Sequence, residues 1–194
     1  MVSASLLLWS LLAVVIVQRA AELRLARQHE VWVRERGAQE FGARHYPAFF
    51  VLHGAWLLAW PLEAALRGPT LAPGWAFWLL LFTAAQALRY WAIRSLGTRW
   101  NTRILLIPGE PPIRRGPYRW ISHPNYVAVV TELAALPLIF GAYWTAGVIG
   151  ALNLALLLGV RIPVEARAWR DSLAQDRADR KFYRGLTLHP RGRG

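Results

Sequence analysis

The chain has 194 residues, of which 55 % are hydrophobic, 11 are Trp and 18 % are charged. Soluble domains carry roughly 25 % charged residues, and one of this length has too little interior to hide so much apolar surface, so the composition favours a membrane protein. The net charge of +12 is spread between apolar runs and not gathered in one patch, which argues against nucleic acid, and the absence of Cys excludes disulfides and Cys nucleophiles.

Five apolar segments approach the length of a membrane-spanning helix, which takes roughly 20 residues and at least about 17. In chain order they cover residues 2–17, 47–66, 75–93, 124–140 and 145–160. The last two are joined by four residues only, which predicts a tight helical hairpin. The first lacks a basic leader and a good cleavage context, so we expect a retained membrane helix and not a signal peptide.

Basic residues fall in three stretches between or after these segments. Residues 19–44 contain six, residues 89–119 contain seven and the chain from Arg161 onward contains nine, whereas only Arg67 lies on the opposite side. The positive-inside rule identifies the basic side as cytoplasmic. We therefore expect five spans, with the N-terminus outside and the C-terminus inside.

Residues 18–44 alternate charged and apolar side chains, which favours an interfacial helix, with a solvated connector helix as the alternative. Glu30 and Arg34 lie four residues apart and can pair. Gly37 and Gly42 then interrupt the helical pattern.

Residues 96–118 form the longest non-helical stretch because Gly and Pro recur along it. Within it we expect residues 98–100 and 103–107 to form a short hairpin. An apolar loop of this length beside a membrane is typically functional. We interpret residues 1–194 as a single membrane domain, with helices in 1–95, a catalytic region in 96–185 and a tail in 186–194.

A polar sequence, GPYRWISHPNY, leads from Gly116 into the fourth apolar segment at Pro124. Proline suits the first turn of a helix, and Ser122 or His123 is expected to cap it. The free N–H groups at such a helix start attract an anion. A His123 that only caps the helix or contacts a lipid headgroup is the alternative.

Further ionisable residues lie at or near membrane depth. Glu132 falls inside the fourth segment, where a charge is costly and indicates function, and it shares a stripe with Asn125. A bond to a neighbouring helix is the structural alternative. Arg161 and Glu165 share a helix face, and an ordinary ion pair is their alternative. Arg89 is expected to extend its charged end to the membrane surface.

Two classes of site are not indicated. The absence of a GxGxxG sequence argues against a soluble dinucleotide-binding domain. The five His are scattered and no HExxH occurs, so we predict no metal site.

In this order, the motifs resemble those of the isoprenylcysteine carboxyl methyltransferase family. That family has a Gly-x-Tyr segment, an Arg-His-Pro-(Ser/Asn)-Tyr helix start, a helical hairpin, an Arg followed by a Glu-Glu pair, and a Tyr-rich tail. The matching residues are Gly116, Tyr118, His123, Pro124, Asn125, Tyr126, Arg161, Glu165, Phe182 and Tyr183. Ser122 replaces the usual Arg and Ala166 the second Glu, and we expect Arg119 to supply the missing positive charge.

The resemblance implies an all-α integral membrane protein with a cytoplasmic cofactor-binding loop, a C-terminal helix and S-adenosyl-L-methionine as cofactor. It places five residues in the cofactor pocket, with Glu165 suited to the cofactor's ammonium group: Tyr118, His123, Asn125, Tyr126 and Glu165. Arg161 would orient the acceptor or balance its charge.

The function implied is O-methylation of a lipophilic acceptor in a bacterial cytoplasmic membrane, with the active site facing the cytoplasm. The acceptor is a carboxylate, or the phenol or enol of a long-chain alkyl phenol or pyrone. A hydroxyl acceptor needs a base, for which His123 and Glu132 are the candidates. The alternatives are an NADPH-dependent membrane reductase of the steroid-reductase type and a non-catalytic lipid-binding protein. Membrane lipids are expected partners, and no protein partner is inferred.

Overall fold

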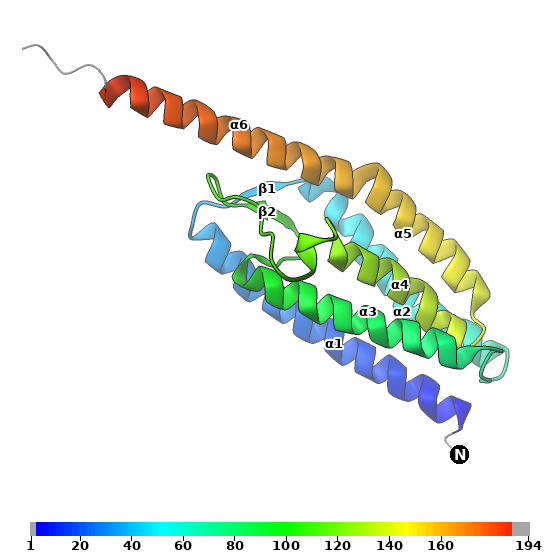
Figure 1. Ribbon diagram of the computed structural model, residues 1–194. Coiled ribbons are helices and arrows are strands. Elements are labelled where there is room, and N and C mark those ends of the chain that lie inside the picture. The colour runs from blue at the N-terminus through cyan, green and yellow to red at the C-terminus, as the bar shows by residue number, and fades with distance from the viewer. Residues whose placement is uncertain (1–2, 188–194) are drawn as a thin grey trace, which may run out of the picture.

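Long apolar helices make up most of the computed structural model, which describes residues 3–187 and the side chains of residues 3–174 (Figure 1). The helices are α1 (Ala4–Arg34), α2 (Tyr46–Leu66), α3 (Trp75–Leu96), α4 (Pro124–Ile139), α5 (Gly150–Leu156) and α6 (Ile162–Thr187). Within the described residues, four segments are long and apolar enough to cross a membrane: Ala4–Arg34, Ala43–Leu66, Trp75–Arg99 and Thr145–Ala174. α4 has 16 residues and is about 24 Å long, which is shorter than the hydrocarbon core of roughly 30 Å.

The first helix corrects the sequence prediction of a short span followed by a separate interfacial helix. α1 runs without a break for 31 residues and ends before Gly37, whose φ is 77°. Neither Gly nor Pro occurs between Gln18 and Arg34, and the polar side chains at the middle of the helix are bonded to residues of α3 and α4. The predicted pair of Glu30 and Arg34 is present at 2.7 Å.

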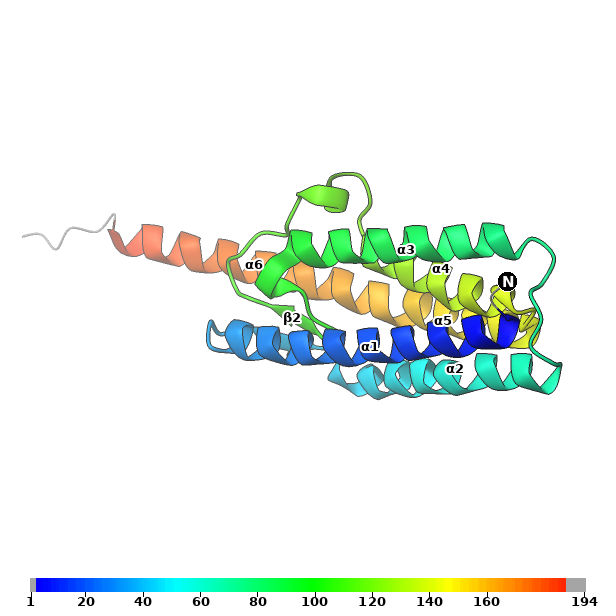
Figure 2. The same ribbon diagram turned by 90° about the horizontal axis from the view of Figure 1, so that it is seen from below.

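A two-stranded sheet lies at one end of the bundle, opposite to the described N-terminal end of α1 (Figures 1 and 2). β1 (Gln39–Phe41) and β2 (Ile104–Leu106) are antiparallel, with Glu40 opposite Leu105. The predicted hairpin between residues 98–100 and 103–107 is therefore wrong. Residues Gly97–Arg99 instead form a 3₁₀ turn, and the partner of β2 comes from a segment more than sixty positions earlier, which no local pattern indicates.

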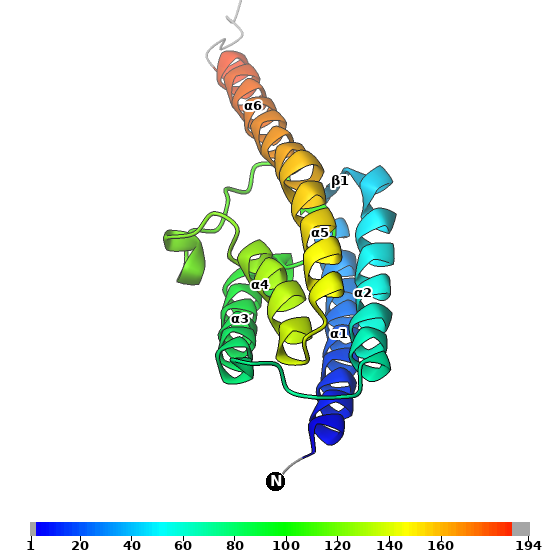
Figure 3. The ribbon, with the colours of Figure 1, turned by 90° about the vertical axis from the view of Figure 1, so that its right-hand side faces the viewer.

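The apolar core lies toward the other end of the bundle, where α3 packs mainly against α4 and α1 runs beside α2 (Figure 3). Trp56 and Trp60 of α2 are fully buried there. Trp60 stacks on Phe140 at 5.7 Å between ring centroids, and the Trp56 indole donates a hydrogen bond of 3.0 Å to the Leu133 carbonyl. These contacts fix α2 against the second half of α4 and the residue that follows it.

The hairpin predicted between the fourth and fifth segments is confirmed, with Gly141 at a φ of 68° in the turn. Beyond it the helix does not stop at residue 160. Two π-helical turns, η4 (Thr145–Ile149) and η5 (Leu157–Arg161), flank α5, and the second leads directly into α6 (Figure 1). The side chains of Phe182 and Tyr183 and most of the predicted tail, residues 186–194, lie outside the described part.

Candidate functional site

A cavity of about 470 Å³ lies between the helices and the segment that contains β2. Its volume falls in the usual range of roughly 300–1,000 Å³ for small-molecule sites. The predicted residues that line it are Tyr118, His123, Asn125, Tyr126, Arg161 and Glu165. Residues of the transmembrane helices extend the lining into the bundle: Arg19, Glu22, His53, Gly54, Leu57, Arg89, Val129 and Asn153. The cavity therefore joins a polar end beside the loops to a part between the helices that has apolar walls, at Leu57 and Val129, and a charged wall, at Arg19, Glu22 and Arg89.

Three of the predicted residues form a hydrogen-bonded chain. The Tyr126 hydroxyl, in the first turn of α4, donates to Glu165 Oε2 at 2.5 Å and accepts from Arg161 Nε at 3.0 Å. Arg161 Nη2 donates to the Thr102 carbonyl at 2.9 Å. The remaining nitrogen, Nη1, makes no hydrogen bond within the described residues, so one N–H edge of a buried guanidinium stays available beside the cavity.

His123 stacks on Tyr126 instead of capping α4. The two rings lie 5.1 Å apart at an angle of 12°, and His123 Nδ1 is 4.0 Å from Glu165 Oε1. His123 occupies the N-cap position, as predicted, but its side chain makes no capping hydrogen bond, so that part of the prediction is wrong. The stacking turns the ring toward the Glu165 carboxylate and the cavity.

Tyr118 reaches the cavity from η3 (Gly116–Arg119), a turn that only Gly can begin. Gly116 has a φ of 57°, and a Cβ there would lie 2.0 Å from Ser95 Oγ. Burial and the Glu165 carboxylate raise the pKa of the Tyr118 hydroxyl, so the hydroxyl stays protonated and able to donate a hydrogen bond. The glycine of the Gly-x-Tyr segment is thus required for a steric reason.

The two departures from the family motif have different structural settings. Ser122 lines the cavity, whereas Ala166 is exposed and outside its lining. Arg119 does not supply the missing charge, because it is exposed, lies over the Trp120 ring at 5.6 Å and is not part of the lining. Arg99 and Arg103 from the loop line the cavity instead, and no sequence pattern distinguishes them from the other arginines.

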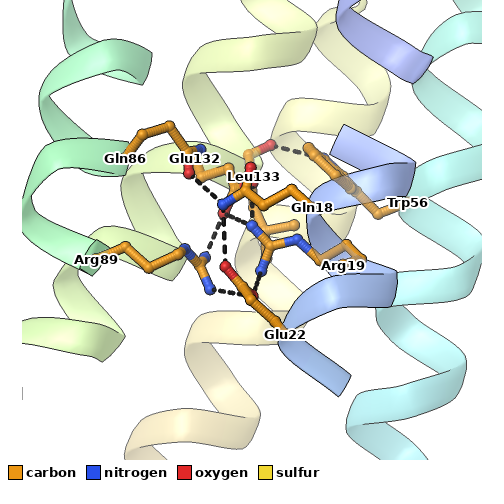
Figure 4. A network of polar contacts seen from close by, with 8 residues as sticks. All are labelled: Gln18, Arg19, Glu22, Trp56, Gln86, Arg89, Glu132 and Leu133. Atoms are coloured by element: carbon orange, nitrogen blue, oxygen red, sulfur yellow. Dashed lines mark hydrogen bonds and ion pairs between the residues drawn. The ribbon is translucent and has the colours of Figure 1, made fainter. Parts of the chain in front are cut away.

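Glu132 lies in a cluster of buried charges and outside the lining of the cavity (Figure 4). Its carboxylate accepts hydrogen bonds from Arg19 Nη2 at 2.6 and 2.9 Å and from Arg89 Nη2. Glu22 bonds Arg19 at 2.7 Å and Arg89 at 3.4 Å. Two arginines and two glutamates balance the charge, and the oxygens of Glu132 are engaged by both guanidiniums.

The same cluster corrects the expectation for Arg89. The side chain is 3 % exposed and turns inward to Glu132, so it does not extend to the membrane surface. Gln18 adds a neutral contact by donating to Gln86 Oε1 at 2.7 Å. The cluster, which we call the charge cluster and define as Arg19, Glu22, Arg89 and Glu132, joins α1, α3 and α4, and all of its members except Glu132 line the cavity.

Residues 78–170 match the isoprenylcysteine carboxyl methyltransferase (ICMT) family. Uncharacterized protein YpbQ of Bacillus subtilis is 41 % identical over 163 residues, which cover 84 % of this chain and 96 % of the relative. An uncharacterized protein of Haemophilus influenzae is 27 % identical over 157 residues, covering 80 % and 91 % of the two chains. No solved structure matches the chain significantly.

Proposed function

Because the chain belongs to the isoprenylcysteine carboxyl methyltransferase family of membrane methyltransferases, we propose that it is an S-adenosyl-L-methionine-dependent O-methyltransferase with a lipophilic acceptor. The observation that carries the proposal is the linked group of Glu165, Tyr126 and Arg161 on the wall of a cavity that continues between apolar helices. A cavity with a polar end beside the loops and apolar walls between the helices can bring a charged cofactor and a lipophilic acceptor into contact.

The residues at the polar end fit the cofactor. Glu165 Oε1 has no hydrogen bond within the described residues and suits the cofactor's ammonium group. Asn125 Oδ1 is buried and has no partner among the described residues, so it can accept a hydrogen bond from the ligand, and the protonated Tyr118 hydroxyl can donate one. The start of α4 suits its carboxylate. When bound, S-adenosyl-L-methionine supplies an electrophilic methyl group, with S-adenosylhomocysteine as the second product.

The chain's own residues then position the acceptor and move its proton. Arg161 keeps Nη1 free to hold an anionic acceptor oxygen, while Tyr126 and Thr102 fix its other nitrogens. A carboxylate acceptor needs no base. The hydroxyl of an alkyl phenol or pyrone does, and His123, on the cavity wall, would accept that proton. For Glu132 we propose a structural role, because two guanidiniums engage its oxygens.

The bilayer setting supports the acceptor class. Four apolar helices and the family make the protein an integral membrane protein, and the apolar walls at Leu57 and Val129 lie on the membrane-depth part of the cavity. We propose that the acceptor enters from the membrane and that the polar end faces the cytoplasm, as the basic loops favour.

The test is incubation of the purified protein with methyl-labelled S-adenosyl-L-methionine and a total bacterial lipid extract, followed by mass spectrometry of the labelled products. The proposal predicts one class of lipophilic product that gains a methyl group on oxygen, and loss of that product with Arg161→Ala. Thermal stabilisation by NADPH, without stabilisation by S-adenosylhomocysteine, would contradict it.

A further inference from the structure

The membrane-depth part of the cavity contains a polar side chain that the proposed cofactor site does not use. Asn153 of α5 is 1 % exposed and lines the cavity. Neither its Oδ1 nor its Nδ2 has a hydrogen-bond partner among the described residues. Buried side-chain amides are nearly always hydrogen-bonded, and an unmade bond is most costly where no water competes. An amide left open in this place is explained by a ligand that supplies the bond.

The helix that carries Asn153 is distorted in a way that aligns this residue with Arg161. The two are eight residues apart, or about 12 Å along a helix axis. In a regular α-helix eight steps of about 100° leave two side chains roughly 80° apart. The π-helical turn η5, which ends at Arg161, has more residues per turn and so rotates less per residue than an α-helix. It therefore reduces the angle between the two side chains. Both residues consequently face the same cavity.

The surroundings of Asn153 leave room for a ring and an alkyl chain. Leu57, Val129 and Leu157 line this part of the cavity, and a Cβ added at Gly54 would meet no atom within 4 Å. The other polar residues at this depth already have partners. His53 Nδ1 is bonded to the Phe49 carbonyl at 2.8 Å, and Arg19, Glu22 and Arg89, which also line the cavity, pair within the charge cluster. The amide of Asn153 is thus the group with both a donor and an acceptor to offer.

We propose that Asn153 binds a second polar group of the acceptor, a hydroxyl or carbonyl that is not methylated. This inference rests on the proposed methyl transfer and narrows its acceptor to an alkyl-bearing ring with two oxygen groups, such as a dihydroxyaryl compound. One group lies toward Arg161 and receives the methyl. The other oxygen group bonds the Asn153 amide deeper in the membrane. The ring of the acceptor then lies between the side chains of Arg161 and Asn153 and spans the distance that separates them along the helix.

A pair of probes that differ by one hydroxyl tests the proposal. Methyl transfer is measured with pentadecylresorcinol, which has two hydroxyls, and with pentadecylphenol, which has one. The wild type should have a KM for the resorcinol lower by roughly tenfold, the typical value of one buried hydrogen bond. Asn153→Leu should raise the KM for the resorcinol to that for the phenol, leave the KM for the phenol unchanged, and leave S-adenosylhomocysteine affinity unchanged.

Stability distinguishes binding from a structural role. Because the amide has no partner among the described residues, Asn153→Leu should unfold at the same temperature as the wild type or higher. Leu152→Ala, on the exposed side of α5, is the matched control and should change neither KM. Lower thermal stability of Asn153→Leu, or an equal rise of KM for both probes, would overturn the proposal.

Failure of the wider function gives a different result. If the wild type transfers no methyl group to pentadecylresorcinol, the inference is overturned with its acceptor class. Binding of S-adenosylhomocysteine by the same preparation would then leave the methyltransferase proposal standing, and absence of that binding would remove both.

Discussion

Replacement of Glu132 by Leu tests the structural role of the charge cluster. The change leaves Arg19 and Arg89 with only Glu22 between them, so one positive charge stays buried and unbalanced. Removal of one partner of a buried ion pair costs about 3–5 kcal/mol. For a chain of this length each kcal/mol lowers the melting temperature by about 2–4 °C, so we expect the melting temperature in detergent to fall by roughly 10 °C. Trp fluorescence during heating measures this change.

A compensating variant makes that prediction sharper. Arg89→Met combined with Glu132→Leu leaves the Arg19 and Glu22 pair, which is charge-balanced at 2.7 Å. Apolar replacement of a whole buried pair is often neutral, so the double variant should regain most of the lost stability. Glu30→Leu, in the exposed pair with Arg34, should cost at most about 1 kcal/mol. A double variant less stable than Glu132→Leu alone would refute the reasoning.

Three further changes probe the loops and the site. Arg161→Ala should lower turnover at least tenfold while S-adenosylhomocysteine still binds, as isothermal titration would measure; normal turnover would remove its acceptor role. Gly116→Ala should destabilise the protein more than Gly68→Ala, because both have a positive φ but only Gly116 lacks space for a Cβ; equal melting temperatures would contradict the steric argument. Although partial burial opposes it, hydrogen bonds from Arg34 and Arg103 lower the pKa of the Glu40 carboxyl below 4.5. Its stabilisation is therefore present above about pH 4.5 and lost as the pH falls through the folded pKa, so wild type and Glu40→Gln should converge in acid.

Apolar segments and the Gly and Pro residues that bound them were sufficient to predict α2, α3 and the start of α4. Residues 47–66 and 75–93 are bounded by Pro and Gly, and Pro124 suits a first helical turn, so each boundary has a local cause. The five residues predicted around the cofactor line one cavity together with Arg161, because the helix start, the hairpin and the end of η5 bring them together.

Long-range contacts explain what the sequence did not indicate. The local pattern places Arg19 and Glu22 in an interfacial helix because their partners, Arg89 and Glu132, are far away in the chain. The pairing of β1 with β2 depends on the same separation. Asn153 did carry a signal, since it is the one polar side chain between residues 146 and 160, but only the structure shows that its amide is buried and open.

Titration of S-adenosylhomocysteine into the purified wild type, Glu165→Gln, His123→Ala and Glu30→Gln tests the proposed cofactor site most directly. Glu165 and His123 line the cavity, whereas Glu30 pairs with Arg34 outside it. We predict saturable binding by the wild type and by Glu30→Gln, and at least tenfold weaker binding by the other two. No binding by the wild type, or the same affinity in all four proteins, would contradict the account.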